Sequence, residues 1–169
     1  CTVQMWGGMF CYQTDEKGLP EGYDFNKNLT PLEDGFNENY FEKLVSGTDK
    51  KLSAKAFLAT EQRIPGLGNG VLQDILFNAR INPKTRLENL RDKQLNNMYK
   101  AVKETLEEMK LNGGRDTEKD LFGSEGGYKT ILSNKTANNS CPVCGGNVVR
   151  EAYLGGNVYY CPACQPWVK

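Results

Sequence analysis

The amino-acid sequence predicts a mainly helical protein that ends in a small β-hairpin built around four cysteines. Apolar residues recur at helical spacing in four segments between residues 36 and 111, and glycine or proline stands at the segment ends. After residue 140, two C-x-x-C pairs flank a stretch that alternates like β-strands. With 169 residues, 38% of them hydrophobic and 25% charged, the chain fits one or two small globular domains.

Four amphipathic segments make up the predicted helical part. In the first, Phe36, Tyr40 and Leu44 repeat every four residues, as on one face of a helix. The links between segments are short, which predicts one compact unit. The predicted bounds are residues 36–47 ended by Gly47, 54–62 with Ser53 as N-cap, 71–82 ended by Asn82-Pro83, and 90–111 with Asn89 and Asp92 as a capping pair and Gly113-Gly114 as its stop.

The first residues predict two strands without a sheet of their own. Thr2 to Trp6 alternate in strand fashion, Gly7-Gly8 break the pattern, and residues 9–12 resume it. An isolated hairpin is marginal in water, and the next strand signal lies beyond residue 140. We therefore expect orphan strands of a sheet whose other members are missing; a hairpin packed on the helices stays open as the alternative. Residues 13–35, rich in glycine and proline, predict a connecting loop.

The charge balance and the absence of histidine narrow the function classes. Lys plus Arg and Asp plus Glu number 21 each, so any nucleic-acid surface must be local. Without histidine, a Ser-His-Asp triad, a Cys-His dyad and a two-histidine zinc site are excluded. The chain has no run of 18 apolar residues and no signal-peptide pattern, so we expect a soluble, cytoplasmic protein with no membrane partner.

The four C-terminal cysteines have the spacing of a structural zinc site. Cys141 and Cys144 form one C-x-x-C pair, Cys161 and Cys164 form the other, and 16 residues with strand character separate them. Such a small unit folds with metal binding, which contributes about 10–16 kcal/mol. Four thiolates close the coordination sphere, so one Zn²⁺ would be structural. Disulfides or a redox pair are the competing interpretations, and the distant Cys1 and Cys11 are expected to be buried apolar residues.

The segment from Pro65 to Gly70, with three glycines, leads into the third predicted helix. It is not a dinucleotide-binding loop, because the residues before it predict a helix rather than a strand. A glycine turn at a helix start leaves backbone N–H groups free, which suits a phosphate oxygen. Asn69 would either cap this helix or donate its amide to a phosphate, and the residues alone leave both open.

The order of these motifs resembles the C-terminal half of the formamidopyrimidine-DNA glycosylase and endonuclease VIII family. The I-P-G-L-G-N turn, the Asn82-Pro83 and Gly113-Gly114 helix ends, an aromatic-glycine loop and the final cysteines with a glutamine carry the resemblance over residues 30–166. It implies a helix-two-turns-helix DNA-binding domain at 31–132, a zinc finger at 133–169, and remnants of a catalytic β-sandwich domain at 1–30. The implied parent is a base-excision-repair DNA glycosylase with abasic-site lyase activity.

The resemblance also implies roles for single residues. Asn69, with the N–H groups of Gly68 and Gly70, would bind the phosphate beside an everted nucleotide. Lys55 would face the DNA and the active-site cleft, with a solvated lysine as the alternative. Tyr128 is a further predicted DNA contact. The implied partner is double-stranded DNA with a damaged base or an abasic site, bound by a monomer.

Three departures from the family pattern bear on activity. Cys1-Thr2 stand where the family has a Pro-Glu start, so this chain contains no catalytic residue and is expected to be inactive alone. Gly156 replaces the arginine of the finger, for which Arg150 or Lys129 would substitute unless each is simply solvated. The loop at 123–128 is shorter than the family's lesion-capping loop.

The balanced charge also limits the strength of DNA binding. Because few phosphates can be neutralised, we expect a modest salt dependence and weak affinity for intact duplex. Two other functions stay open: a non-catalytic relative that binds damaged DNA, and a module that binds RNA or protein.

Overall fold

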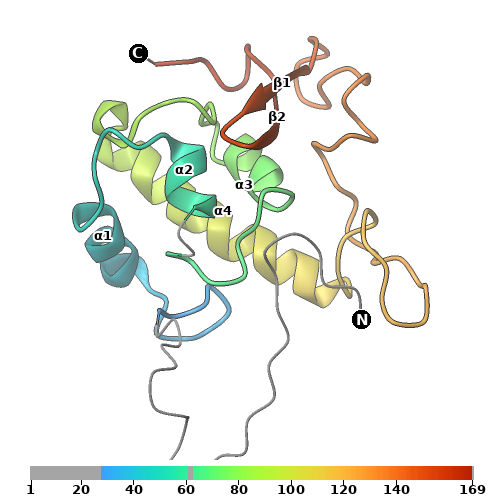
Figure 1. The fold of residues 1–169 in the computed structure, drawn as a ribbon, viewed down its shortest axis with the longest axis horizontal. Helices are drawn as coiled ribbons and strands as arrows, with labels where there is room; N and C mark the ends of the chain where they lie inside the picture. The colour runs from blue at the N-terminus through green and yellow to red at the C-terminus, as the bar shows by residue number, and fades with distance from the viewer. Residues whose placement is uncertain (1–27, 61–62, 169) are drawn as a thin grey trace, which may run out of the picture.

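The computed structural model describes residues 28–60 and 63–168. Figure 1 shows helices gathered around the long α4, with a β-hairpin beside α3. The mainly helical fold with a small antiparallel hairpin is confirmed, whereas the hairpin predicted for residues 2–12 lies outside the described residues. The elements are α1 (Glu38–Ser46), α2 (Ala54–Ala59), α3 (Leu72–Asn78), a 3-10 turn (Leu87–Asn89), α4 (Asp92–Leu111), β1 (Val149–Tyr153) and β2 (Gly156–Tyr160).

Polar caps fix the starts of the first two helices. The Asn37 side chain accepts a hydrogen bond from the N–H of Tyr40 at 3.0 Å, and the Ser53 hydroxyl accepts one from Ala56 at 3.2 Å. Each bond satisfies a backbone donor that the helix itself leaves free. The predicted N-cap at Ser53 is therefore confirmed.

Two helix ends differ from the prediction. α2 ends at Ala59, three residues early, and α3 ends at Asn78 rather than near Asn82. Arg80 has a φ of 59° and the N–H of Ile81 bonds to the Leu76 carbonyl at 3.0 Å, which is the left-handed stop called a Schellman motif. No pattern of apolar residues reveals such a stop.

The predicted capping pair of α4 is wrong. Asn89 belongs to the preceding 3-10 turn, and the N-cap is Arg91, whose N–H donates to the Gln94 side chain at 3.1 Å. At the other end the prediction holds: Gly113 and Gly114, with φ of 67° and 103°, follow the last helical turn. Only glycine adopts such angles without strain.

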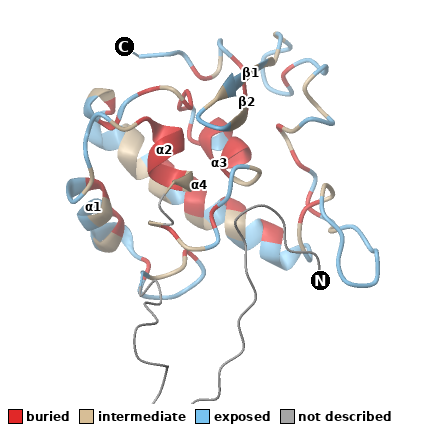
Figure 2. Ribbon diagram, viewed as in Figure 1, coloured by how far each residue is buried: buried red, intermediate tan, exposed pale blue. Residues whose placement is uncertain are grey.

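The main core fills the space between α4 and the three shorter helices. Figure 2 shows buried residues along α2, α3 and one side of α4. Aromatic rings from different elements meet there: Phe41 and Phe57 pack edge to face with centroids 5.6 Å apart, and Phe36 lies 6.2 Å from Phe41. Burying such rings supplies most of the stabilisation of this body.

A second, smaller core joins α3 to the cysteine hairpin. It consists of buried Phe77 from α3, Leu132 from the segment before the hairpin, and Tyr159, Cys141 and Cys161. α3 therefore packs on α4 with one side and on β2 with another. This double packing positions the hairpin relative to the helices.

β1 and β2 pair antiparallel, from Val149 opposite Tyr160 to Tyr153 opposite Gly156. Leu154 and Gly155 form the two-residue turn between them, with φ of 48° and 71°. Two positive φ angles define a type I′ turn, whose twist matches that of the strands. Within the described part of the chain, no helix has the length and apolar character needed to cross a bilayer.

Candidate nucleic-acid interface

The glycine turn before α3 lies against the tip of the cysteine hairpin. The Asn69 amide donates to the Asn157 carbonyl at 3.2 Å, across 88 residues of sequence. At Gly156, a Cβ would stand only 3.2 Å from the Asn69 amide nitrogen. Hence the two segments that the resemblance assigns to phosphate binding are adjacent in space.

Asn69 does not cap α3. The N-cap is Val71, and no side chain hydrogen-bonds there. Of the two interpretations left open by the sequence, capping is wrong, and the exposed Asn69 amide reaches the hairpin instead. The backbone N–H groups of Gly68, Asn69 and Gly70 donate no hydrogen bond to any described residue. Three donors on one short, accessible turn could bind an anion.

Gly70 has a role that the sequence did not reveal. A Cβ there would lie 2.6 Å from the Arg115 Nη2, so the glycine makes room for a guanidinium. At Gly68, by contrast, a Cβ would have no neighbour within 4 Å among residues 28–60 and 63–168, so a ligand can approach the turn from this side. Arg115 follows the glycine pair at the end of α4 and belongs to no sequence motif, so nothing in the sequence marked it.

The Gln73 side chain connects the glycine turn to the hairpin by hydrogen bonds. Its buried amide donates to the carbonyls of Asn69 at 2.9 Å and Asn157 at 3.2 Å, and its carbonyl oxygen accepts from the Tyr159 N–H at 3.1 Å. A buried side chain with all three bonds made holds one geometry, because each alternative leaves a buried group unpaired. Sequence reasoning missed Gln73 because it lies within an apolar helical stripe.

Lys55 on α2 binds the hairpin turn rather than solvent. It is 3% exposed, and its ammonium donates to the Tyr153 carbonyl and lies 3.5 Å from the Leu154 carbonyl oxygen. Burial lowers the pKa of Lys55. The solvated alternative is therefore wrong, and the ammonium acts here as a clasp between α2 and the hairpin.

Asp74 anchors the segment that leads to the hairpin. This fully buried carboxylate accepts hydrogen bonds from the N–H groups of Ile131 at 3.0 Å and Leu132 at 2.8 Å. Burial raises the pKa of Asp74, although these bonds and one from the Tyr128 hydroxyl oppose the rise. Tyr128 itself is 4% exposed and burial raises its pKa, so its ring is part of the interior here. That burial argues against the predicted direct DNA contact by Tyr128.

The two candidate substitutes for the finger arginine lie in different places. Lys129 is exposed and its ammonium stands 3.8 Å from the Asp116 carboxylate. Arg150 donates to the Asn134 side chain at 2.9 Å and lies over the Tyr159 ring at 6.0 Å. Asn134 and Tyr159 line the same hollow as Asn69, so Arg150 is the candidate nearer to the interface.

A buried glutamine completes the attachment of the hairpin. The Gln165 side chain, directly after the last cysteine, donates to the Ile81 carbonyl at 2.9 Å and accepts from the Cys161 N–H at 3.0 Å. The Asn82 side-chain amide donates a hydrogen bond to the backbone carbonyl of Gln165 at 3.0 Å. We call the buried polar residues Lys55, Gln73, Asp74, Asn82 and Gln165 the seam.

The four predicted cysteine ligands converge on one point. The sulfur atoms of Cys141, Cys144, Cys161 and Cys164 all lie within 4.8 Å of one another, with pairs at 3.7 and 3.4 Å. Tetrahedral zinc with bonds of about 2.3 Å places its sulfur ligands about 3.8 Å apart. Burial raises the pKa of Cys164, whereas, against the effect of burial, hydrogen bonds from backbone N–H groups lower the pKa of Cys141, and a dication bound among the four sulfur atoms would favour their thiolate form. The donor set therefore fits a structural zinc ion.

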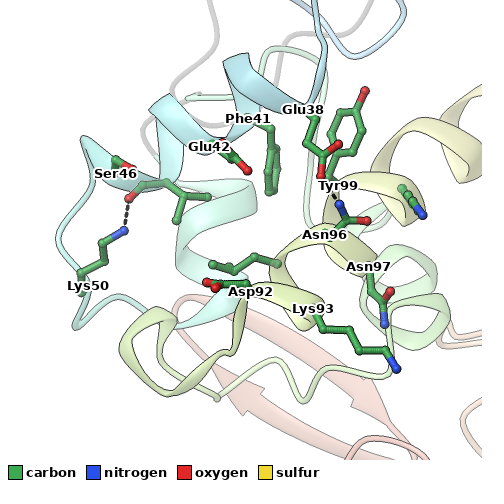
Figure 3. A pocket seen from close by; sticks show the side chains of 13 residues that line it. Glu38, Phe41, Glu42, Ser46, Lys50, Asp92, Lys93, Asn96, Asn97 and Tyr99 are labelled. Carbon is green, nitrogen blue, oxygen red and sulfur yellow. Dashed lines mark hydrogen bonds between the residues drawn. The ribbon is translucent and has the colours of Figure 1, made fainter.

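Two hollows on the surface of the described residues are candidates for the interface. The larger, about 650 Å³, lies between α1 and α4 (Figure 3). Its walls carry both charge signs, such as Glu42, Asp92 and Lys93, and it contains none of the predicted site residues. The smaller, about 350 Å³, lies beside Asn69 and Arg115. The smaller hollow is therefore the one that belongs to the interface.

Comparison with known proteins agrees with this arrangement. The family model for the formamidopyrimidine-DNA glycosylase H2TH domain matches residues 28–119. A formamidopyrimidine-DNA glycosylase of Prochlorococcus marinus (strain NATL1A) is 30% identical over 167 residues, covering 96% of this chain and 57% of that protein. One of Carboxydothermus hydrogenoformans is also 30% identical, over 96% of this chain and 58% of its own length. The chain thus spans less than two thirds of these relatives.

Solved structures give the same result for the fold. The MutM (Fpg) protein of Thermus thermophilus superposes with a TM-score of 0.73 at 26% identity, over 84% of this chain and 55% of that one. Lactococcus lactis Fpg in complex with DNA containing an abasic site superposes with a TM-score of 0.70 at 23% identity, over 82% and 51%. Since the family model matches more than half of the residues, this chain belongs to the formamidopyrimidine-DNA glycosylase family.

Proposed function

We propose that this chain is the DNA-binding part of a base-excision-repair DNA glycosylase with abasic-site lyase activity. Its partner would be double-stranded DNA that contains a damaged base or an abasic site, bound by a monomer in the cytoplasm. The observation that carries the proposal is the contact of the glycine turn with the hairpin tip, where Asn69 and Asn157 meet. The proposal includes a helix-two-turns-helix arrangement of the four helices.

The geometry suits a clamp on the sugar-phosphate chain. Chemistry on a base requires that the nucleotide leave the stack, at a cost of a few kcal/mol, and fixed phosphate contacts offset that cost. The free N–H groups of Gly68, Asn69 and Gly70 and the exposed Arg150 are the proposed phosphate contacts. The seam keeps them at a fixed spacing, because its hydrogen bonds connect both segments to α3.

Zinc is the proposed metal of the cysteine site. Its role is to fold the hairpin and hold it against α3, and Cys141, Cys144, Cys161 and Cys164 are its proposed ligands. With four thiolates around the ion, no position remains for water or substrate. The ion therefore takes no part in bond cleavage.

Binding measurements with three nucleic acids test the function. Fluorescence anisotropy of the chain should give the tightest binding for a duplex with a tetrahydrofuran abasic analogue, weaker binding for the undamaged duplex, and the weakest for a structured RNA. Equal or tighter binding of the RNA would instead support an RNA-binding module. Binding to none of the three would refute the proposal.

Asn69→Ala tests the clamp itself. We expect weaker binding to the abasic duplex, because an amide donor and a fixed turn are lost. Asn97→Ala, an exposed asparagine on α4 at the larger hollow, is the matched control and should bind like the wild type. Zinc content and thermal unfolding of both variants separate a lost contact from a misfolded hairpin.

A non-catalytic relative that binds damaged DNA is the second candidate, favoured by Gly156 in place of the finger arginine. Borohydride trapping of the full-length protein on an abasic duplex distinguishes the two. A lyase forms a Schiff base with the opened sugar, which borohydride reduces to a stable covalent adduct. The absence of an adduct, with binding intact, would favour the non-catalytic candidate.

A further inference from the structure

The smaller hollow beside Asn69 contains an arginine that has fewer partners than its burial requires. The Arg115 side chain is about nine-tenths buried, with a relative exposure of 10%. A guanidinium has five N–H donors, yet within the described residues Arg115 makes one side-chain hydrogen bond, from Nη2 to the Glu118 carboxylate. In the part of the chain that the structure describes, its Nε–H is buried without an acceptor, and the buried hydroxyl of Thr117 on the same wall has no hydrogen-bond partner.

Such an arrangement points to a ligand. A buried, permanently charged group with unpaired donors is costly unless an acceptor arrives. The hollow in front of it, about 350 Å³, is some ten times the ~30 Å³ that one water occupies in the liquid, so a phosphate group fits. Lys135 lines the same hollow, and its ammonium donates to the Asp116 carbonyl at 2.9 Å and lies 3.9 Å from the Glu125 carboxylate. Two basic residues from different segments thus line one hollow.

Glu118 occupies the place that a phosphate would take. Its side chain is 65% exposed, and its only side-chain partner among the described residues is Arg115. Carboxylate and phosphate oxygens present the same geometry to a guanidinium, so the one can replace the other. Only the Glu118 side of this ion pair is exposed, so its carboxylate can exchange the guanidinium for water at a modest cost. One wall of the hollow thus carries an internal anion that a phosphate can replace.

We propose that this hollow binds a backbone phosphate of DNA, with Arg115 and Lys135 as binding residues and Glu118 as the internal anion that the phosphate displaces. The inference rests on the proposed DNA-binding function and adds a second phosphate site beside the Asn69 turn. Gly70 connects the two sites, because the guanidinium packs against the position where a side chain would start. Glu118 sets the affinity of the second site.

The test compares two charge-matched variants in DNA binding. Glu118→Gln removes the competing carboxylate, and affinity for the abasic duplex should rise about two- to five-fold, the range of an ion pair with one solvent-exposed partner. Glu42→Gln makes the same change in net charge on α1, beside the larger hollow, and should give a much smaller rise. Equal rises in both variants would overturn the inference, because the effect would then be one of net charge.

The role of Arg115 is tested in the wild type and in the Glu118→Gln variant. Arg115→Gln should reduce the slope of log affinity against log salt by about 0.9, the value for one phosphate contact. In the double variant with Glu118→Gln, the gain from Glu118→Gln should vanish. A gain that persists without Arg115 contradicts the proposal. Because Glu118 is exposed, its variant remains informative even if Arg115→Gln fails to fold.

Inorganic phosphate distinguishes a DNA site from a small-anion site. Titrated against the DNA complex, it should compete only weakly, since a single ion lacks the contacts of the chain. If free phosphate saturates the protein while Glu118→Gln leaves duplex affinity unchanged, the hollow is a small-anion site and the inference is wrong. If the wild type binds no DNA at all, the proposed function itself fails, which is a separate outcome.

Discussion

The helical core and the seam are held together by different forces. The core consists of buried apolar side chains such as Phe41, Leu58 and Leu76, whose packing tolerates modest changes of shape. The seam consists of buried polar groups that hydrogen-bond in fixed directions, for example Gln73 and Gln165. We infer that the helical core is stable by itself. The position of the hairpin, by contrast, depends on each hydrogen bond of the seam, so the loss of one bond should shift or loosen the hairpin.

Loss of the proposed zinc ion should have the largest effect, because it would unfold the hairpin and leave the helical core intact. Cys161→Ser, or removal of zinc with a chelator, removes folding energy on the order of 10 kcal/mol from the hairpin. We expect the hairpin and DNA binding to be lost while most helical circular dichroism remains. Val143→Ala, an exposed residue between the first two cysteines, should keep both the metal and DNA binding. Complete loss of helix in Cys161→Ser would contradict independent stability of the helical core.

Asp74 should give the next largest effect, because it joins the helical body to the segment before the hairpin. Asp74→Ala leaves the buried N–H groups of Ile131 and Leu132 without an acceptor, which costs about 2–5 kcal/mol. Urea unfolding measures the loss. The exposed Glu107→Ala on α4 is the control and should stay within about 0.5 kcal/mol of the wild type.

The pH dependence of this contribution has a definite sign. Burial raises the folded-state pKa of Asp74 above its ordinary value of 3.8. Between these two values the native state binds more protons than the unfolded state, so stability falls as pH rises. The contribution is complete below 3.8 and is lost as the pH passes through the folded pKa. The stability of the wild type minus that of Asp74→Asn should therefore decrease above pH 3.8, and an increase would refute this assignment.

Substitution of Lys55 should have a smaller effect on stability. It distinguishes a structural role of this lysine at the hairpin turn from a direct contact with DNA. Lys55→Met leaves the carbonyls of Tyr153 and Leu154 without their cation, at a cost of about 1–3 kcal/mol in unfolding free energy. If the ammonium serves the hairpin alone, the salt dependence of DNA binding stays the same. A slope reduced by about 0.9 would mean that Lys55 contacts a phosphate. Lys93→Met, exposed on α4, controls for loss of one charge.

The sequence predicted the elements better than their connections. Apolar spacing located all four helices, and the cysteine pairs located the hairpin, because both signals are local. The partners of Lys55 and Asn69 lie 98 and 88 residues away, so no local pattern could reveal them. The early stop of α3 depends on one left-handed residue, Arg80, which a pattern of apolar residues does not encode.

Gly156→Arg should have the smallest effect on stability. It tests whether an arginine at the hairpin tip strengthens DNA binding. The φ of Gly156 lies outside the left-handed region, so a side chain is allowed, and its Cβ requires the exposed Asn69 amide to move by a few tenths of an ångström. An arginine there places a cation beside the glycine turn, so the salt slope of DNA binding should rise by about 0.9. Gly156→Gln adds bulk without charge and should leave the slope unchanged. If both variants weaken DNA binding equally, Asn69 needs the space beside Gly156. The geometry that the seam maintains, rather than the absence of an arginine at position 156, would then limit the affinity for DNA.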